Sequence, residues 1–138
     1  MRICIDSCVF IRGIPYADSD AGQLLDRISP ALRVFIPRIV AVETTRNLKT
    51  VTDVARFYHL FHERPFAQIV DEPIPQDLFQ RYIDLGLRAK GDAYIGAFAE
   101  WLRVDYLISD NRHFLRHLRT EAYRLLTPAD FLEAIDLP

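Results

Sequence analysis

The chain has 138 residues, of which 50% are hydrophobic and 26% charged, the balance of a folded domain that can bury a core without disulfides or bound metal. Its formal net charge of −2 excludes a strongly basic nucleic-acid coat protein, so a polyanion would have to be held by a local basic patch or through metal ions. The two cysteines, Cys4 and Cys8, are too few for a disulfide framework or a zinc site. No apolar run approaches the roughly 18 residues of a membrane span. Free thiols and the lack of a signal-like segment lead us to expect a cytoplasmic protein.

Predicted strands and helices alternate almost throughout the sequence. Short runs rich in apolar and β-branched residues predict five strands, at residues 2–6, 32–36, 66–70, 105–109 and 123–126. Proline, glycine and capping residues punctuate the segments between them and predict helices at 19–29, from Pro37, around 54–61, and at 76–87, 92–102, 111–118 and from Thr127. Between the first strand and the first helix we expect a loop, marked by Gly13 and Pro15. This alternation predicts an α/β fold with a parallel sheet and helices on both faces, and we expect residues 1–138 to form a single domain.

Four carboxylates fall at the ends of predicted strands or near the starts of predicted helices. Asp6 ends the first strand and Asp110 follows the fourth, whereas Asp92 opens a helix and Glu43 lies in the helix after Pro37. In an open parallel sheet, strand C-termini and helix N-termini share one edge, where ligands bind. Carboxylates gathered there would repel one another without a cation, and an all-oxygen cluster favours Mg²⁺ or Mn²⁺. The pattern therefore predicts a divalent-metal site and a metal-dependent phosphodiester nuclease.

Each acid also has an ordinary structural interpretation. Asp92 and Asp110 could be plain helix N-caps, because aspartate is favoured there and suits the positive end of the helix dipole. Asp6 is harder to explain in this way, since an unpaired charge at the end of a buried strand is energetically unfavourable. Glu43 is expected on the helix face that packs on the sheet, and its alternative is a surface ion pair with Arg46.

Four segments, taken in order, resemble the PIN-domain ribonucleases, the fold of the VapC-type toxins. They are residues 3–7 (ICIDS), 36–43 (IPRIVAVE), 91–97 (GDAYIGA) and 107–114 (LISDNRHF). The resemblance implies a PIN-like three-layer α/β/α sandwich around a parallel sheet of about five strands. It also implies a Mg²⁺- or Mn²⁺-dependent endoribonuclease that hydrolyses RNA phosphodiester bonds.

The same resemblance assigns roles to individual residues. It implies catalytic residues at Asp6, Glu43, Asp92, Asp110 and Asn111, and metal ligands at Asp6, Asp92, Asp110 and Glu43. The fourth position departs from the family pattern, which places an acid or asparagine two residues after a serine or threonine. From Ser109 that residue is Asn111, with Asp110 one place earlier, so the site could use either or both. An asparagine carbonyl remains a competent oxygen ligand.

Polar residues next to the acids are candidates for contacts with the substrate. They are Ser7, Arg12, Lys90, Ser109 and Arg112. By resemblance the substrate is RNA, single-stranded or in a loop, where unstacked bases are accessible. The resemblance further implies a homodimer and an antitoxin protein as partner, with the chain as the toxin of a toxin–antitoxin pair.

Two other functions compete with the nuclease. A catalytically inactive PIN-fold binding scaffold is compatible with the departure at Asp110 and Asn111. A receiver-like phosphoacceptor domain also gathers acids around Mg²⁺, but it needs two adjacent acids after the first strand and a lysine after the fifth. Asp6 has no acidic neighbour, and residues 126–128 contain no lysine.

Overall fold

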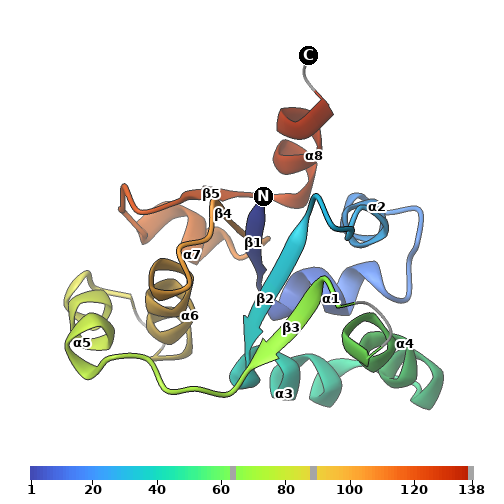
Figure 1. Cartoon of the computed structure of the whole chain (residues 1–138), viewed down its shortest axis with the longest axis horizontal. Helices are drawn as coiled ribbons and strands as arrows, with labels where there is room; N and C mark the ends of the chain where they lie inside the picture. The colour runs from blue at the N-terminus through green and yellow to red at the C-terminus, as the bar shows by residue number, and fades with distance from the viewer. Residues whose placement is uncertain (63–64, 88–89, 137–138) are drawn as a thin grey trace.

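Five short parallel strands form one sheet at the centre of the molecule (Figure 1). The computed structural model describes residues 1–62, 65–87 and 90–136. Within these ranges the strands are β1 (Arg2–Ile5), β2 (Arg33–Pro37), β3 (Ala67–Val70), β4 (Tyr106–Ile108) and β5 (Arg124–Leu126). They lie in the order β3-β2-β1-β4-β5, and every neighbouring pair is parallel. The predicted parallel sheet of five strands is therefore confirmed.

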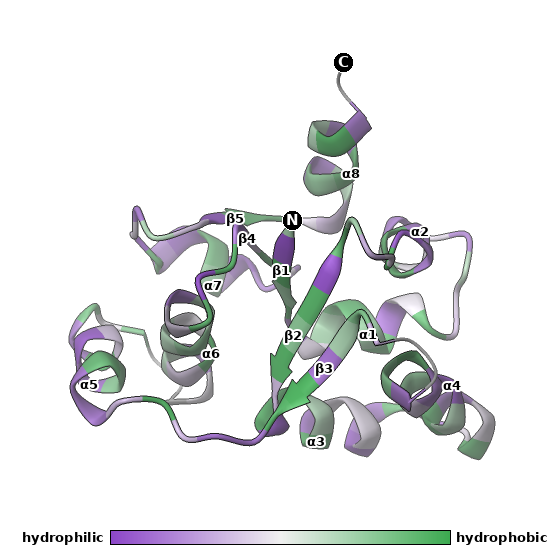
Figure 2. Ribbon diagram, viewed as in Figure 1, coloured by the Kyte–Doolittle hydropathy of each residue, from purple (hydrophilic) through white to green (hydrophobic). Residues whose placement is uncertain are grey.

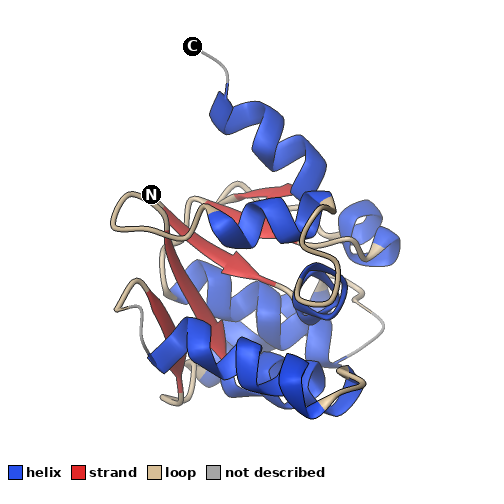
Figure 3. Cartoon of the chain, turned by 90° about the vertical axis from the view of Figure 1, so that its right-hand side faces the viewer, coloured by secondary structure: helices blue, strands red, loops and turns tan. Residues whose placement is uncertain are grey.

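Helices cover both faces of this sheet. They are α1 (Ser7–Gly13), α2 (Asp20–Asp26), α3 (Arg38–Asn47), α4 (Val51–His62), α5 (Gln76–Asp84), α6 (Lys90–Trp101), α7 (Arg112–His117) and α8 (Pro128–Asp136). Figure 1 shows α1 to α4 on one side and α5, α6 and α7 on the other, which confirms the three-layer α/β/α sandwich. Turned by 90°, the molecule shows α8 extending beyond the sheet (Figure 3).

The core is built on the two central strands. Ile3, Cys4 and Ile5 of β1 are 0% exposed, and so are Leu107 and Ile108 of β4. A strand that is buried on both faces has a continuous run of apolar residues in its sequence, because neither face contacts water. Figure 2 shows the hydrophobic character of these strands.

The strand order determines where a site can form. The chain runs outward from β1 through β2 to β3 and then returns to place β4 on the other side of β1. This reversal leaves a crevice between the C-terminal ends of β1 and β4, the usual ligand site of open parallel sheets. Receiver-like folds have the order 2-1-3-4-5 instead. The receiver alternative is therefore wrong for this chain.

Helix α1 was not predicted from the sequence. Asp6 caps it by accepting a hydrogen bond from the next backbone N–H, and Val9 and Phe10 bury one helical face completely. The helix continues to Gly13, where a Cβ would lie 2.9 Å from the backbone of Ala21 in α2. Only glycine permits this approach. An N-cap followed by apolar residues at the third and fourth helical positions was the available signal, and the loop assigned around Gly13 obscured it.

Helix α3 presents a different face to the sheet from the one expected. Its buried residues are Val40, Ala41 and Thr44. Ile39 and Val42 are 40% and 43% exposed, and Glu43 is also exposed. The expectation that Glu43 lies on the packed face was therefore wrong. Glu43 is instead an exposed residue of α3.

Two helix boundaries also differ from the prediction. Helix α5 ends at Asp84 rather than near residue 87, because Gly86 adopts a φ of +86° that ends the helical path. Helix α6 begins at Lys90, so Asp92 lies in its first turn rather than at the N-cap. The plain-cap interpretation of Asp92 is therefore wrong, although a first-turn acid still favours the helix dipole.

Candidate active site

Asp6 lies where β1 ends and α1 begins, beside the end of β4. Its Oδ1 accepts a hydrogen bond from the Ser7 N–H at 2.8 Å, and its Oδ2 accepts one from the Ser109 hydroxyl at 2.8 Å. The residue is only 5% exposed. Burial raises the pKa of Asp6 and the negative charge of Glu43 adds to the rise, while the hydrogen bonds from Ser109 and Ser7 oppose it. Asp6 is thus a fixed, poorly hydrated carboxylate.

Ser109 couples the two strands that flank the crevice. It is 0% exposed, and its hydroxyl donates to Asp6. The same oxygen accepts a hydrogen bond from the Asn111 N–H at 3.0 Å, which ties the chain after β4 to the site. The Ser109 hydroxyl is therefore both a donor and an acceptor. It orients Asp6, although the two residues are 103 positions apart in the sequence.

Asp92 shares an electrostatic environment with Asp6 and Glu43. It is half-buried in the first turn of α6. Burial, followed by the negative charges of Asp6 and Glu43, raises the pKa of Asp92 to about 6. Glu43 reaches this group from α3, whose Ile39 lies against the start of α6: a Cβ on Gly91 would be 3.7 Å from Ile39 Cδ1. The fold thus brings three of the four predicted acids into one negative cluster, which we call the acid cluster (Asp6, Glu43 and Asp92).

Asp110 and Asn111 form hydrogen bonds with residues outside the acid cluster. Asp110 Oδ2 accepts hydrogen bonds from Arg12 Nε and Nη2 at 3.1 and 2.7 Å. Asn111 Oδ1 accepts the backbone N–H groups of His113 and Phe114 at 3.0 and 3.3 Å and is the N-cap of α7. The capping role considered for Asp110 therefore belongs to Asn111, and Asp110 forms an ion pair instead.

The carboxylate oxygens of the acid cluster are ligands that a hard divalent cation prefers. The three carboxylates are too far apart to bind one ion together, which limits how many ligands the cluster supplies. Among the described residues, no cationic side chain forms an ion pair with any of the three acids. Within the same residues, no group of three or more His, Cys, Asp or Glu side chains is gathered closely enough to hold a metal ion. Mg²⁺ is usually bound through one or two carboxylates and keeps several waters. Asp6 and Asp92 fit that ligand set, with Glu43 at the rim.

The other predicted site residues have varied surroundings. Ser7 is buried and supports Asp6 through its backbone N–H, as Ser109 does through its hydroxyl. Arg12 is engaged by Asp110 and also pairs with Asp20. Arg112 is exposed as the first residue of α7. Lys90 is the first residue of α6, and its side chain lies outside the described part of the structure.

Cys8 lies in the site although sequence reasoning treated it only as a free thiol. Its Sγ is 3.8 Å from Asp6 Oδ2 and 3.7 Å from Ser109 Oγ, and it accepts the Asp110 N–H at 3.4 Å. Burial, with the nearby Asp6 charge, raises the pKa of Cys8 to about 11. The thiol therefore stays protonated at neutral pH. The missed signal was its place two residues after Asp6, in the first turn of the unpredicted α1.

The strand order, the acids at the β1–β4 crevice and the sequence agree on one class of protein. Residues 3–119 match the PIN domain, and the chain therefore belongs to the PIN domain family. Comparison with curated proteins finds no significant match. No described helix is both long enough and apolar enough to cross a membrane.

Two solved structures share the fold. One is VapBC2 from Rickettsia felis bound to a DNA fragment from its promoter, with a TM-score of 0.64 and 16% identity over 92% of this chain and 98% of that chain. The other is PAE2754 from Pyrobaculum aerophilum, with a TM-score of 0.63 and 17% identity over 98% of this chain and 95% of that chain.

Proposed function

We propose that this PIN-domain protein is a Mg²⁺- or Mn²⁺-dependent endoribonuclease. The observation that carries the proposal is the acid cluster, which concentrates negative charge at the β1–β4 crevice with no ion-pair partner among the described residues. Such a cluster is unfavourable on its own and becomes favourable when a cation binds. A bound divalent ion would lower the pKa of its water and stabilise charge on the scissile phosphate.

The residues divide into those that hold the ion and those that hold the ligands in place. We assign Asp6 and Asp92 as the principal metal ligands and Glu43, on the exposed rim, as the group that orients water or completes the shell. Ser7 and Ser109 fix the rotamer of Asp6 through their hydrogen bonds. This arrangement keeps one carboxylate rigid and leaves the other two accessible.

Asp110 and Asn111 receive supporting roles in this proposal. Asp110 is oriented by Arg12, and Asn111 caps α7 and bonds to the Ser109 hydroxyl. A second metal at Asp110 would have to compete with the Arg12 guanidinium. We therefore favour a single principal metal position, between Asp6 and Asp92.

The substrate and partner proposals follow from the family and the fold. We propose single-stranded RNA as the substrate, since unstacked bases and a flexible backbone can enter an open crevice. The likeness to VapBC2 supports the proposal that this chain is the toxin of a toxin–antitoxin pair, active as a homodimer and inhibited by a small protein.

The test is RNA cleavage with and without Mn²⁺, together with the Mn²⁺-induced change in melting temperature. Asp92→Asn keeps the size of the side chain and removes its charge, and we expect it to abolish both cleavage and the thermal shift. Asp130→Asn is the matched control, because Asp130 is an exposed first-turn acid of α8.

Three outcomes separate the alternatives. Cleavage and a thermal shift that only Asp92→Asn removes would support the nuclease. Neither cleavage nor a shift in the wild-type protein would overturn it and favour the binding scaffold. Cleavage that persists undiminished in Asp92→Asn would indicate a contaminating nuclease or a wrongly assigned site.

A further inference from the structure

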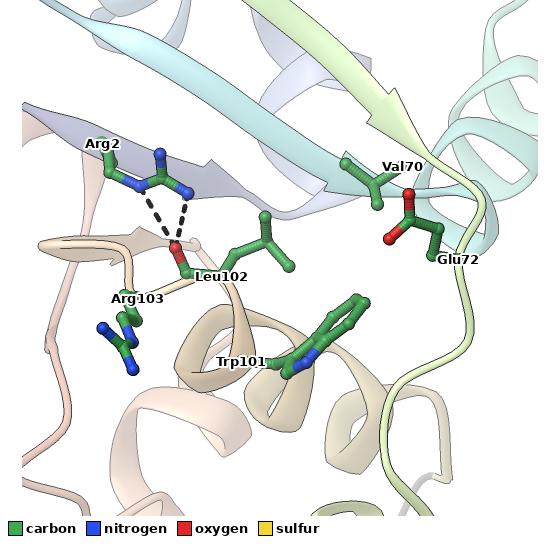
Figure 4. A pocket seen from close by; sticks show the side chains of 6 residues that line it. All are labelled: Arg2, Val70, Glu72, Trp101, Leu102 and Arg103. Carbon is green, nitrogen blue, oxygen red and sulfur yellow. Dashed lines mark hydrogen bonds between the residues drawn. The ribbon is translucent and has the colours of Figure 1, made fainter.

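A groove of about 480 Å³ lies apart from the acid cluster, between the C-terminal end of α6 and the strands on the β3 side of the sheet. It is lined by Arg2, Val70, Glu72, Trp101, Leu102 and Arg103 (Figure 4). We propose that this groove binds a nucleotide of single-stranded RNA, with the base on Trp101 and the phosphate on the neighbouring arginines. The proposal deepens the proposed function and rests on RNA being the substrate. The volume lies within the roughly 300–1,000 Å³ of ordinary small-ligand sites.

The basic end of the groove is held rigidly by the sheet. Arg2 and Arg33 are partners in adjacent strands, and both guanidiniums lie over the ring of Phe35, at 4.3 and 5.4 Å from its centroid. Arg2 also donates from Nε and Nη2 to the Leu102 carbonyl at 3.1 and 2.7 Å. A guanidinium fixed by an aromatic face and a carbonyl needs little further ordering to meet an anion.

The charges at this end complement a phosphate. Among the described residues, Arg2, Arg33 and Arg103 form no ion pair with a carboxylate. Asp105, an acid on this side, accepts the backbone N–H of Arg2, and Arg103 shares a neighbouring pocket with Glu100 and Glu121 without an ion pair to either in the described part of the chain. Arg2 and Arg103 line the groove and Arg33 is the cross-strand neighbour of Arg2, so arginines without an ion pair among the described residues form a local basic patch in a chain of net charge −2, of the kind that holds a polyanion.

The other end of the groove offers surfaces for a base. Trp101 is half-buried, and its indole lies across the groove from Glu72 and Val70 (Figure 4). Stacking on an aromatic ring tolerates any base, because every base has a π-face. Glu72 is the carboxylate among the lining residues and can accept hydrogen bonds from a base amino group. Its charge repels phosphate, which orients the base toward Glu72 and the phosphate toward the arginines.

Helix α6 connects this groove to the acid cluster. Asp92 lies in its first turn and Trp101 is its last residue, so the rise of the helix separates the two by about 14 Å. Nine residues also turn the helix by about 900°, so the two side chains leave opposite sides of α6, and a short single strand that joins them has to pass around the helix as well as along it. The groove would then hold the RNA a few nucleotides from the bond that is cut.

Trp101 is the only tryptophan in the chain, so its fluorescence reports directly on the groove. We would titrate the wild-type protein with a single-stranded decanucleotide RNA in EDTA, where metal-dependent cleavage cannot occur. Base stacking on the indole is expected to quench the fluorescence. A fluorescein-labelled decanucleotide, followed by anisotropy, measures the same binding in variants that lack the tryptophan.

The variants separate stacking from charge. Trp101→Leu keeps an apolar side chain but loses the ring, and we expect roughly tenfold weaker binding, whereas Trp101→Phe should retain most of the affinity. Arg103→Ala should lower the slope of log affinity against log salt by roughly 0.7, the value for one phosphate contact on a single strand. Arg56→Ala is the control, since Arg56 is an exposed arginine of α4 on the opposite face. Thermal unfolding of each variant verifies that it is folded.

The outcomes distinguish this inference from the nuclease itself. Quenching in EDTA, with weaker binding in Trp101→Leu and Arg103→Ala only, supports the groove whether or not the protein cleaves. Unchanged fluorescence with RNA bound, or equal affinity in all variants, overturns the groove and leaves the nuclease standing if the wild type still cleaves. A dinucleotide too short to span α6 should be cleaved equally by the wild type and Trp101→Leu, and unequal cleavage would contradict the proposed path.

Discussion

The guanidinium of Arg12 donates through both Nε and Nη2 to a single carboxylate oxygen of Asp110, at 3.1 and 2.7 Å. The two side chains are 38% and 32% exposed, so solvent screening keeps the energy of the pair modest. The main effect of the Arg12–Asp110 pair is on geometry, because it holds the Asp110 carboxylate in an orientation that points toward α1. The ion pair separates Asp110 from the acid cluster, whose three acids have no such partner among the described residues.

This separation predicts different outcomes for two isosteric substitutions. Asp110→Asn should leave cleavage within about tenfold of wild type, since an amide oxygen can still accept a hydrogen bond from Arg12. Asp92→Asn should abolish it. The measurement is the cleavage rate together with the Mn²⁺-induced thermal shift. Loss of that shift in Asp110→Asn, to the same extent as in Asp92→Asn, would show that Asp110 binds the metal.

Ser109→Ala should weaken the site without contacting the metal. It removes a buried hydrogen bond to Asp6 and leaves that carboxylate oxygen with only the weak Cys8 thiol donor at 3.8 Å, at a cost of about 1–3 kcal/mol of stability. Because the Ser109 hydrogen bond lowers the pKa of Asp6, its loss should raise that pKa further and reduce Mn²⁺ affinity at mildly acidic pH.

Chemical denaturation and Mn²⁺ titration near pH 6 test the Ser109 prediction. Ser29→Ala is the control, because the Ser29 hydroxyl accepts the backbone N–H of Ala31 in the same loop. Equal Mn²⁺ affinity in Ser109→Ala and Ser29→Ala would show that the serine is not needed to orient Asp6.

The raised pKa of Asp92 predicts a pH dependence of the metal-free protein. In the unfolded chain this carboxyl titrates near pH 4, whereas burial and the neighbouring acids raise its pKa to about 6 in the fold. The folded protein therefore binds more protons between these values, and the stability gained from protonation is complete below about pH 4 and lost as the pH rises through 6.

Asp92→Asn removes this dependence and should be more stable than wild type at neutral pH. After allowance for the solvent screening of a half-buried group, we expect a difference of about 1 kcal/mol that disappears near pH 4. Thermal unfolding in EDTA at a series of pH values measures it. A difference that did not change with pH would have another origin.

Alanine substitutions at two glycines of α6 should have opposite effects on stability. A Cβ on Gly96 would lie 2.8 Å from Tyr82 Cδ1 and 3.3 Å from the Tyr123 hydroxyl, which itself donates to the Gly96 carbonyl at 2.9 Å. Gly96→Ala should therefore destabilise the protein by about 1–3 kcal/mol. Gly91→Ala is the matched control: its nearest neighbour is at 3.7 Å, and alanine favours a helix by up to about 1 kcal/mol over glycine. Denaturant midpoints of both variants test the contrast.

The predictable parts of the fold were those encoded locally. Strand β1 could be predicted because its apolar residues are contiguous, and the start of α8 because Pro128 suits the first helical position. The exposed face of α3 could not, since Ile39 and Val42 are as apolar as the residues that it buries. The spacing of apolar residues does not say which of two apolar stripes meets the sheet.

The remaining features of the site depend on contacts between distant residues. The partner of Asp110 is Arg12, which lies 98 positions away in the sequence. The groove depends on the register that places Arg2 beside Arg33, over Phe35. A single sequence gives the residue types in such contacts but not their partners.

The return of the chain from β3 to β4 divides the acid cluster between two halves of the sequence. Asp6 and Glu43 precede the turn at Gly86, and Asp92 and Ser109 follow it. Neither half contains a complete site, so a partly synthesised or proteolysed chain that ends at the Gly86 turn lacks Asp92 and also lacks Ser109, the hydrogen-bond donor to Asp6. If the proposed function holds, the chain becomes active only when all five strands have formed the sheet. A chain cut at the Gly86 turn would then behave as a split enzyme, inactive as separate fragments and restored when they associate.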